Sequence, residues 1–404
     1  MTTIIKPTKA DLDKLVAPYL KTQPSGLAFA IGYASPQFSP HGSIYFHGDA
    51  TNQFGQPLTL DGNTPFQLAS LSKTFTATLY ALLIRSLSPS QTVGDYIVPN
   101  GPLPISSNLA GISLDELVNY TSGLPQDNDT DINDSPPNLP LPYSVTGMLS
   151  YLNASPPAVN GTGTTYTYSN LAFGLMAAIL SGTNPPGTNG FTRLIRKRLL
   201  DPLSMGSRYF NKVPIALLPQ AYAYDYTSSP PYWATAPGWP LFPAYFGAGG
   251  LVASANDMLQ WLKFNMGLIK VESLTSLLPA LQTPSTTVEA WGTTQLGLGW
   301  FITPGSADSP GSVWKDGGFA GTNTYIAFLP SGAPGSASSQ AGVFVLLNAG
   351  GITSDYTNGG PEVSAVIAND LLAIMQGQTP PADKSRYPRS VVSPRRVRPS
   401  PTQR

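Results

Sequence analysis

The sequence predicts a mixed α/β (α+β) fold in which an antiparallel sheet, flanked by helices, is assembled from both ends of the chain around an inserted helical lobe. Strand-like segments lie near the two ends of the 404-residue chain, and short helices joined by loops rich in Pro, Asn and Gly occupy its middle. This order favours one sheet built from distant parts of the chain. We therefore expect 1–85 and 248–376 to form the sheet domain, 86–247 the helical lobe, and 377–404 a basic tail.

The N-terminal region carries signals for two helices and a hairpin. Apolar residues at helical spacing within 12–20 predict the first helix. The segments 27–33 and 43–47, rich in apolar and aromatic residues, flank a Ser/Pro/Gly turn and predict a hairpin. From Ser70 onward apolar residues recur every three to four positions, so a long helix should follow and end near Pro89.

The later elements follow in order. Short helices are predicted at 113–119 and 170–180. Beyond Gly249 we expect a helix, four strands and a last helix, at 256–266, 296–302, 312–315, 323–329, 342–347 and 362–375. The tail combines Pro with Arg and should be disordered and solvated; an arm for nucleic acid or an anionic surface is the alternative.

Composition excludes several chemistries. The chain has no Cys, so a disulfide framework, a cysteine nucleophile and an iron–sulfur site are excluded, and its 2 His argue against a zinc site. We expect no metal and no cofactor. Seven basic residues lie beyond Gly377, which leaves 15 basic and 21 acidic residues in the body. A body of that sign does not favour nucleic acid.

Membrane and targeting signals are also missing. No apolar run approaches the roughly 18 residues that cross a bilayer, so we expect no membrane span. Charged residues and Pro7 interrupt the first twenty positions, unlike a secretory signal. The protein either stays in the cytoplasm or had a signal removed, and its compartment and oligomeric state stay open.

Two spacings could carry chemistry. Ser70 and Lys73 lie one helical turn apart, so the amine can reach the hydroxyl as its base or electrostatic partner. The same Ser-x-x-Lys spacing recurs at Ser312, but in a strand-like stretch, where residues three apart face opposite sides. An ordinary helix-capping serine is the alternative for Ser70.

Two further groups stand near predicted element ends. Tyr168 and Asn170 form a Tyr-x-Asn just before an apolar helix. Lys315 is followed by Asp316 and the paired glycines Gly317 and Gly318, which let a ligand approach the backbone closely. Each group alone is a weak signal, and a simple turn is the alternative for the glycines.

Together these groups resemble the penicillin-recognising serine hydrolases, specifically the class C β-lactamases and their esterase and D-peptidase relatives. The resemblance covers the chain from about Leu27 to Met375 and implies a β-lactamase/transpeptidase-like fold. Six blocks carry it in the family's order: FQLASLSKTFT (66–76), LVNYTSGLP (117–125), YTYSNLAFGL (166–175), PLSMG (202–206), GGLVASAND (249–257) and WKDGGFAGTNTYIAFLP (314–330).

The resemblance implies a role for each site residue. Ser70 would be the nucleophile, and Lys73 and Tyr168 would share its proton, with the identity of the general base left open. Asn170 would orient Lys73 and the substrate. Lys315 would supply positive potential. The substrate carbonyl would meet the backbone N–H groups of Ser70 and of Gly318, beside Gly317.

One residue departs from the family pattern. β-Lactamases of this family usually carry a hydroxyl residue at position 316, which helps to hold the penicillin carboxylate. Asp316 would repel an anion at close range unless it points away along the strand. This favours an esterase or amidase acting on neutral or amine-bearing substrates. A β-lactamase or D-alanyl-D-alanine carboxypeptidase is the second hypothesis, and a non-catalytic binding member is the third.

The sequence argues against two other functions, a Ser-His-Asp triad and nucleic-acid binding through aromatic residues. A Ser-His-Asp triad needs a mobile imidazole, yet His41 and His47 both fall in the predicted hairpin. The segment 209–246 is dense in aromatic residues but has no Lys or Arg after Lys212, which argues against base stacking. These aromatic residues either pack in the core or form a substrate wall, and Tyr222 resembles a substrate-facing Tyr of the family.

Overall fold

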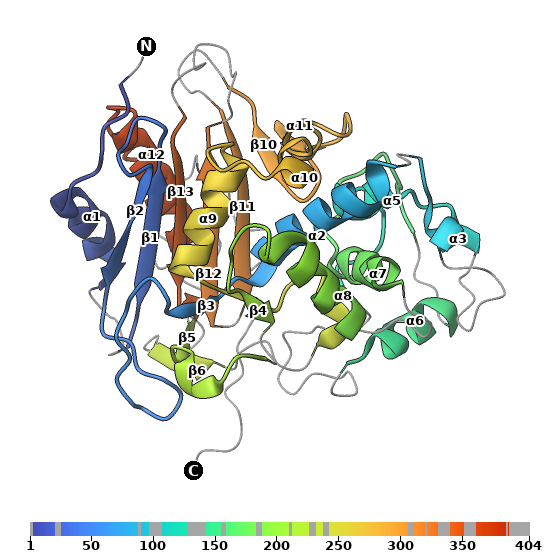
Figure 1. Ribbon diagram of the computed structural model, residues 1–404, viewed down its shortest axis with the longest axis horizontal. Helices are drawn as coiled ribbons and strands as arrows, with labels where there is room; N and C mark the ends of the chain where they lie inside the picture. The colour runs from blue at the N-terminus through green and yellow to red at the C-terminus, as the bar shows by residue number, and fades with distance from the viewer. Residues whose placement is uncertain are drawn as a thin grey trace.

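In the computed structural model, segments far apart in the chain form one sheet. The structure describes residues 3–20, 26–87, 90–96, 107–127, 143–154, 159–182, 188–209, 212–225, 232–236, 242–305, 311–319, 321–329, 340–350, 361–384 and 387. The eight strands of the main sheet run in the order β2 (Gly42–His47), β1 (Phe29–Ala34), β13 (Gly342–Leu347), β12 (Thr322–Phe328), β11 (Ser312–Phe319), β10 (Phe301–Thr303), β9 (Thr294–Leu296) and β8 (Glu289–Ala290). Every neighbouring pair is antiparallel (Figure 1). The predicted α+β class is confirmed.

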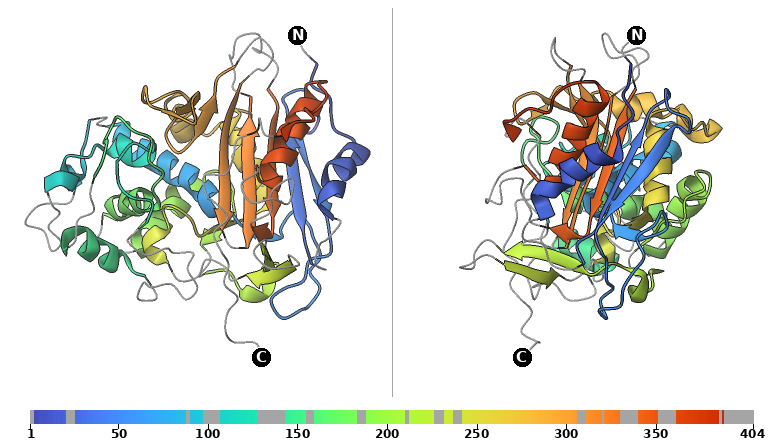
Figure 2. Two further views of the ribbon diagram at one scale, coloured as in Figure 1. Left: turned by 180° about the vertical axis from the view of Figure 1, so that it is seen from behind. Right: turned by 90° about the vertical axis from the view of Figure 1, so that its left-hand side faces the viewer.

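Helices cover both faces of this sheet. α12 (Val363–Met375) and α1 (Lys9–Val16) lie on one face, and α9 (Ala255–Asn265) lies on the other (Figure 2). Every residue of β1, β12 and β13 is therefore buried, as expected for strands covered on both sides. The α9 side also receives α2 (Ser72–Tyr80), through Phe75 stacked on Trp261 with ring centroids 3.9 Å apart.

The middle of the chain is mostly helical and lies beside the sheet. It contains α3 (Val93–Tyr96), α4 (Ser107–Ala110), α5 (Leu114–Val118), α6 (Val145–Ala154), α7 (Asn170–Ser181) and α8 (Thr188–Ile195). Two short helices, α10 (Glu272–Thr275) and α11 (Leu278–Gln282), precede β8. Two small sheets join distant segments: β3 (Pro65–Gln67) with β7 (Leu251–Ser254) and β4 (Arg208–Tyr209), and β14 (Ala349–Gly350) with β5 (Ala221–Asp225) and β6 (Tyr232–Ala236). The division into domains stays a prediction.

Two local predictions are wrong. The segment 296–302 is not one strand: it ends β9 and starts β10, and a turn at Gly297–Trp300 folds one strand back on the other. Gly299 has φ +76° in this turn, a conformation that favours glycine. The helix from Ser70 also begins later, because Ala69–Leu71 form a 3₁₀ turn ahead of α2, and a π-helical turn Ala81–Arg85 follows Tyr80.

Candidate active site

The strained turn before α2 carries Ser70. Ala69, the residue before it, has φ +46°, a left-handed conformation that is costly for a side chain with a Cβ. Two bonds hold the turn at Leu68: its N–H donates to the Leu251 carbonyl (2.9 Å), and the Thr324 hydroxyl donates to its carbonyl oxygen (2.9 Å). Ser70 does not cap a helix, since the caps flanking this turn make no side-chain hydrogen bond. The surrounding strands fix its position.

Lys73 lies fully buried one turn beyond Ser70. Its Nζ is 2.7 Å from Asn170 Oδ1, 2.9 Å from the Ala248 carbonyl oxygen and 3.0 Å from Ser70 Oγ. The first two partners are carbonyl oxygens, which only accept, and they use two N–H bonds. A neutral amine then has its lone pair directed at Ser70, where it can accept the hydroxyl proton. The geometry therefore matches a general base.

Tyr168 completes the contact with Ser70. Its hydroxyl donates to Ser70 Oγ at 2.7 Å, and two lysine nitrogens lie near its ring, with Lys73 Nζ 4.7 Å and Lys315 Nζ 5.4 Å from the centroid. Ser169 caps α7 by accepting from the Ala172 N–H and donates its own hydroxyl to the Pro125 carbonyl. This cap holds Tyr168 and Asn170 at the beginning of the helix.

β11 lies close against the turn that carries Ser70 because position 317 is a glycine. A Cβ at that position would lie 2.5 Å from the Leu68 carbonyl oxygen and 2.4 Å from Thr324 Oγ1. Only glycine therefore allows this approach. Gly318 follows, paired with Asn323 of β12. The strand thus carries Gly318 past Ser70, where its N–H could join that of Ser70 in receiving an oxyanion.

Lys315 and Asp316 form a buried ion pair. Lys315 Nζ lies 2.6 Å from Asp316 Oδ1 and 2.7 Å from the Asp316 carbonyl oxygen. Both residues are buried, at 0% and 3% exposed. The aspartate neither stands free to repel an anion nor points away from Lys315. Instead it neutralises the cation that the sequence had indicated as a source of positive potential.

Burial moves the pKa values of the two candidate bases in opposite directions. Desolvation, helped by the charge of Lys315, holds the pKa of Lys73 well below its usual value. Desolvation and then the charge of Asp316 raise the pKa of Tyr168 well above its usual value, and the hydrogen bond to Ser70 only partly offsets them. The first shift favours the neutral amine of Lys73, and the second favours the neutral phenol of Tyr168. Of the two alternatives that the sequence left open, these shifts are the ones that a Lys73 base would need.

Sequence reasoning missed Asp127. Its Oδ1 accepts from Asn170 Nδ2 at 3.0 Å, so it orients the amide whose oxygen faces Lys73. Asp127 is 7% exposed, and its charge raises the pKa of Lys73 against the larger effects of desolvation and Lys315. Asp127 stands next to the LVNYTSGLP block (117–125), and an acidic residue in that place was the available signal.

The remaining predicted residue, Tyr222, has different surroundings. It is 9% exposed, and its hydroxyl points at Gly26, where a Cβ would lie 2.6 Å from the phenol oxygen. Its role as a substrate contact stays a prediction. Several of its aromatic neighbours in sequence are core residues, namely Tyr209, Phe242, Tyr245 and Phe246. Tyr226 and Trp239 lie outside the described residues, as does most of the basic tail.

Replacing Asp127 separates its charge from its hydrogen bond. Asp127→Asn keeps an acceptor for Asn170 but removes the charge, so the pKa of Lys73 should fall further and the acidic limb of kcat/KM should move to lower pH. Asp127→Leu removes both and should lower kcat by about tenfold, because a buried donor without a partner costs about 1–3 kcal/mol. Asp115→Asn is the control. A pH profile unchanged in Asp127→Asn would contradict this role.

The fold, together with the convergence of Ser70, Lys73 and Tyr168, matches the arrangement that the resemblance in the sequence implied. The β-lactamase family model matches residues 38–364. The chain belongs to the β-lactamase family. A β-lactamase of Pseudomonas fluorescens is 31% identical over 64% of this chain and 66% of its own length, and the β-lactamase of Providencia stuartii is 28% identical over 65% and 62%. Less than two thirds of either relative is therefore matched.

Another relative is named for a different activity, and solved structures resemble the whole fold. The D-alanyl-D-alanine-carboxypeptidase/endopeptidase AmpH of Escherichia coli is 24% identical over 78% of this chain and 77% of its own length. Among solved structures, a class C β-lactamase aligns with TM-score 0.67 at 24% identity, covering 90% of this chain and 95% of that one. The octameric penicillin-binding protein homologue of Pyrococcus abyssi aligns with TM-score 0.70 at 19% identity over 92% and 78%. These structures establish the fold.

Proposed function

We propose that the protein hydrolyses ester or amide bonds through an acyl-enzyme formed on Ser70. The observation that supports this proposal most directly is that Ser70 Oγ contacts both Lys73 Nζ, at 3.0 Å, and the Tyr168 hydroxyl, at 2.7 Å. Neutral Lys73 takes the hydroxyl proton as Oγ attacks the carbonyl carbon. The N–H groups of Ser70 and Gly318 stabilise the oxyanion. The same proton then goes to the leaving alkoxide or amine, with the Tyr168 hydroxyl as the relay.

Deacylation uses the same groups in reverse. Water attacks the acyl carbon and gives its proton to Lys73, and the proton then returns to Ser70 Oγ as the acid leaves. No step needs a metal or a cofactor. Within the described residues no group of three or more His, Asp or Glu side chains is placed to hold a metal ion.

The Lys315–Asp316 pair favours an esterase or amidase acting on substrates without a carboxylate. A β-lactam or a D-amino-acid peptide brings a carboxylate to the reacting bond, and a free cation on this strand would pair with it. Here Asp316 Oδ1 already forms an ion pair with Lys315 Nζ, at 2.6 Å. Desolvating a second anion beside that carboxylate is unfavourable. A class C-like β-lactamase or a D-alanyl-D-alanine carboxypeptidase is the second candidate, supported by the names of the relatives.

A substrate comparison tests this preference. The parent should hydrolyse a short-chain nitrophenyl ester well and a chromogenic cephalosporin poorly. Asp316→Thr should raise kcat/KM for the cephalosporin by about tenfold or more, because it frees the ammonium of Lys315 to pair with the substrate carboxylate, and an ion pair at close range is worth about 1–4 kcal/mol. Ester turnover should change little.

The control for this comparison is Asp115→Asn, which breaks another ion pair, the 2.9 Å contact with Arg85. It should leave the ratio of the two activities as it is. Faster cephalosporin than ester turnover by the parent would contradict the proposed role of Asp316. A parent that turns over neither substrate and forms no adduct with a fluorophosphonate would instead favour the non-catalytic alternative.

A further inference from the structure

Basic residues gather on one part of the body. Six of its 15 basic residues lie within 20 positions of sequence, and the single acidic residue among them is Asp201. All six are exposed: Arg193, Arg196, Lys197, Arg198, Arg208 and Lys212. Asp201 pairs with Arg196 at 3.1 Å, which leaves an excess of positive charge. Such a local excess on a body of net negative charge attracts anions.

Three large apolar side chains stand exposed on two neighbouring segments, and one of them, Leu217, lines a cavity together with Arg208. Phe54 is 68% exposed, Leu217 54% and Ile215 46%. Asn52 joins their two loops, because its side-chain amide donates to the Ala216 carbonyl at 3.1 Å. Scattered exposed apolar residues are ordinary. Three exposed on two segments that a hydrogen bond joins are the kind of group that contacts another apolar phase.

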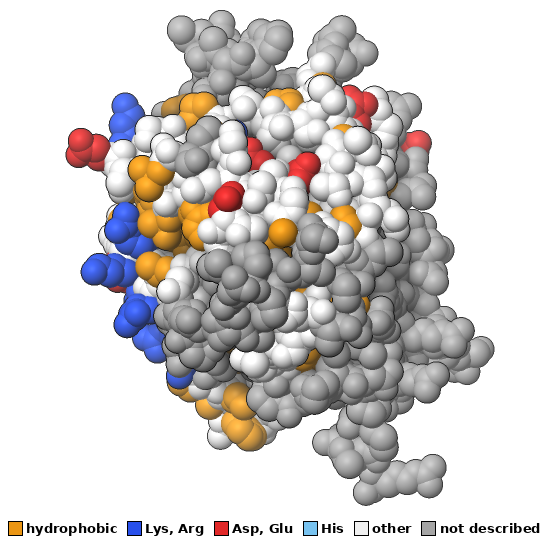
Figure 3. Space-filling view, turned by 90° about the vertical axis from the view of Figure 1, so that its right-hand side faces the viewer, with side chains coloured by type: hydrophobic (Ala, Val, Ile, Leu, Met, Phe, Trp, Pro, Cys, Tyr) orange, Lys and Arg blue, Asp and Glu red, His pale blue; other side chains and the backbone are white. Residues whose placement is uncertain are grey.

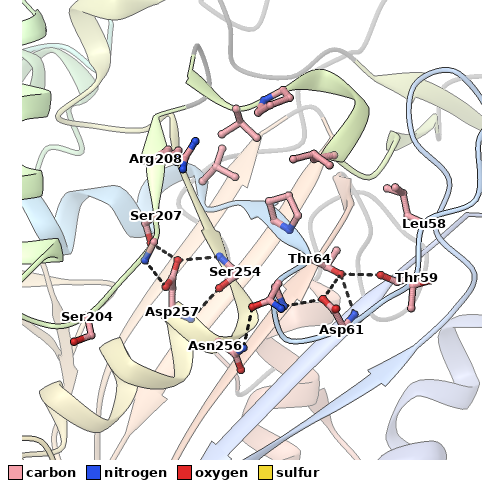
Figure 4. Close-up of a pocket in the computed structure, with 17 residues that line it drawn as sticks. Leu58, Thr59, Asp61, Thr64, Ser204, Ser207, Arg208, Ser254, Asn256 and Asp257 are labelled. Carbon is pink, nitrogen blue, oxygen red and sulfur yellow. Dashed lines mark hydrogen bonds between the residues drawn. The ribbon is translucent and has the colours of Figure 1, made fainter.

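Two adjoining cavities connect the apolar and basic groups. One, of about 700 Å³, is lined by Leu58, Leu217 and Arg208 among others, and the second, of about 480 Å³, by Arg193, Arg196, Arg208 and Lys212 among others. They share Ser207 and Arg208. Figure 4 places Arg208 on the opposite side of the larger cavity from Leu58 and Thr59. The acidic residues that line the larger cavity already accept hydrogen bonds from the protein. Asp257 accepts from the Gly206 N–H and the Ser207 hydroxyl, and Asp61 accepts from the Asn63 N–H.

The basic part also lies on an outer surface of the fold. α8 lies toward the viewer in Figure 1, and along the right-hand edge in the right panel of Figure 2. In Figure 3 the front of Figure 1 forms the left edge, and Lys and Arg side chains follow that edge with apolar side chains beside them. We call Phe54, Ile215 and Leu217, together with the six basic residues, the basic–apolar face.

We propose that the basic–apolar face docks on a phospholipid bilayer with anionic headgroups. The cations would lie at the headgroups, the three apolar side chains would enter the acyl boundary, and the cavity beside Arg208 is large enough to hold a headgroup. Membrane surfaces attract clustered Lys and Arg and accept apolar side chains at the same time. Nucleic acid explains only the cations, because aliphatic Ile215 and Leu217 offer bases no stacking surface.

Vesicle co-sedimentation of the 404-residue chain tests the proposal. Vesicles of phosphatidylcholine mixed with phosphatidylglycerol should bind the protein, and vesicles of phosphatidylcholine alone should bind it at least about tenfold more weakly, since each Lys or Arg adds to the attraction. Arg193→Glu with Arg208→Glu, and separately Phe54→Ser with Leu217→Ser, should each weaken binding to the mixed vesicles by about tenfold or more. Ester hydrolysis in solution should stay at the parent rate in both.

Matched controls change the same kinds of side chain elsewhere. Lys270→Glu reverses another exposed cation, and Leu87→Ser removes another apolar side chain, which is 82% exposed. Both should bind like the parent. Face variants that bind as tightly as the parent would assign binding to the basic tail and overturn the proposal. Equal binding to both kinds of vesicle would also overturn the proposal. The same holds for a preference for a DNA oligonucleotide that depends on the arginines but not on Phe54 and Leu217.

Discussion

Ser70→Ala is expected to lower kcat/KM for a nitrophenyl ester by about 10³-fold or more, the scale on which loss of a nucleophile acts. Ser70 Oγ is the atom that both Lys73 and Tyr168 contact, and no other hydroxyl is described in that position. Fold and stability should change little, because Ser70 caps no helix. Turnover can be followed with the ester, and the nucleophile with a fluorophosphonate adduct mapped by intact mass and peptide analysis.

The chain offers a matched control for this substitution. Ser312 stands three residues before Lys315, with the same Ser-x-x-Lys spacing, but at the beginning of β11. Ser312→Ala should therefore keep both turnover and the adduct. Hydrolysis by Ser70→Ala at the parent rate, or an adduct on another residue, would show that Ser70 is not the nucleophile.

Lys73→Arg is expected to lower kcat/KM by about 10³-fold, within the range of general-base contributions. Arginine keeps a positive charge but does not release its proton in proteins, so it cannot accept the proton of Ser70. Lys73→Met should be equally impaired. Tyr168→Phe should lose less, because in this mechanism the phenol only relays a proton. A greater loss in Tyr168→Phe than in Lys73→Arg would make Tyr168 the base.

The pH dependence of the parent follows from the same assignment. The reaction needs neutral Lys73, so kcat/KM should fall as pH falls through the pKa of this amine. Burial and then the charge of Lys315 hold that pKa well below its ordinary value, which keeps the amine neutral where an exposed lysine is charged. Tyr168→Phe should retain the acidic limb. Its disappearance in that variant would assign the limb to the phenol.

Much of the fold was predictable because its signals are local. α7 and β13 appear almost as periodicity and composition indicate, at Asn170–Ser181 and Gly342–Leu347. The break between β9 and β10 could not be predicted from the sequence, because the turn depends on a left-handed glycine inside an apolar stretch, which periodicity cannot detect. The 3₁₀ turn at Ser70 is held from outside by Leu251 and Thr324, so its own sequence could not reveal it.

Sequence by itself determined which reactive groups the chain owns: the Ser-x-x-Lys on a helix, the Tyr-x-Asn before another, and a lysine followed by glycines on a strand, without Cys and with two His. Tertiary structure alone decided their charges and partners. It buries Lys73 and Tyr168, turns Asp316 onto Lys315 and brings Asp127 to Asn170. The reason is physical: pKa values and ion pairs depend on desolvation and distance, which arise only when segments far apart in the chain pack together.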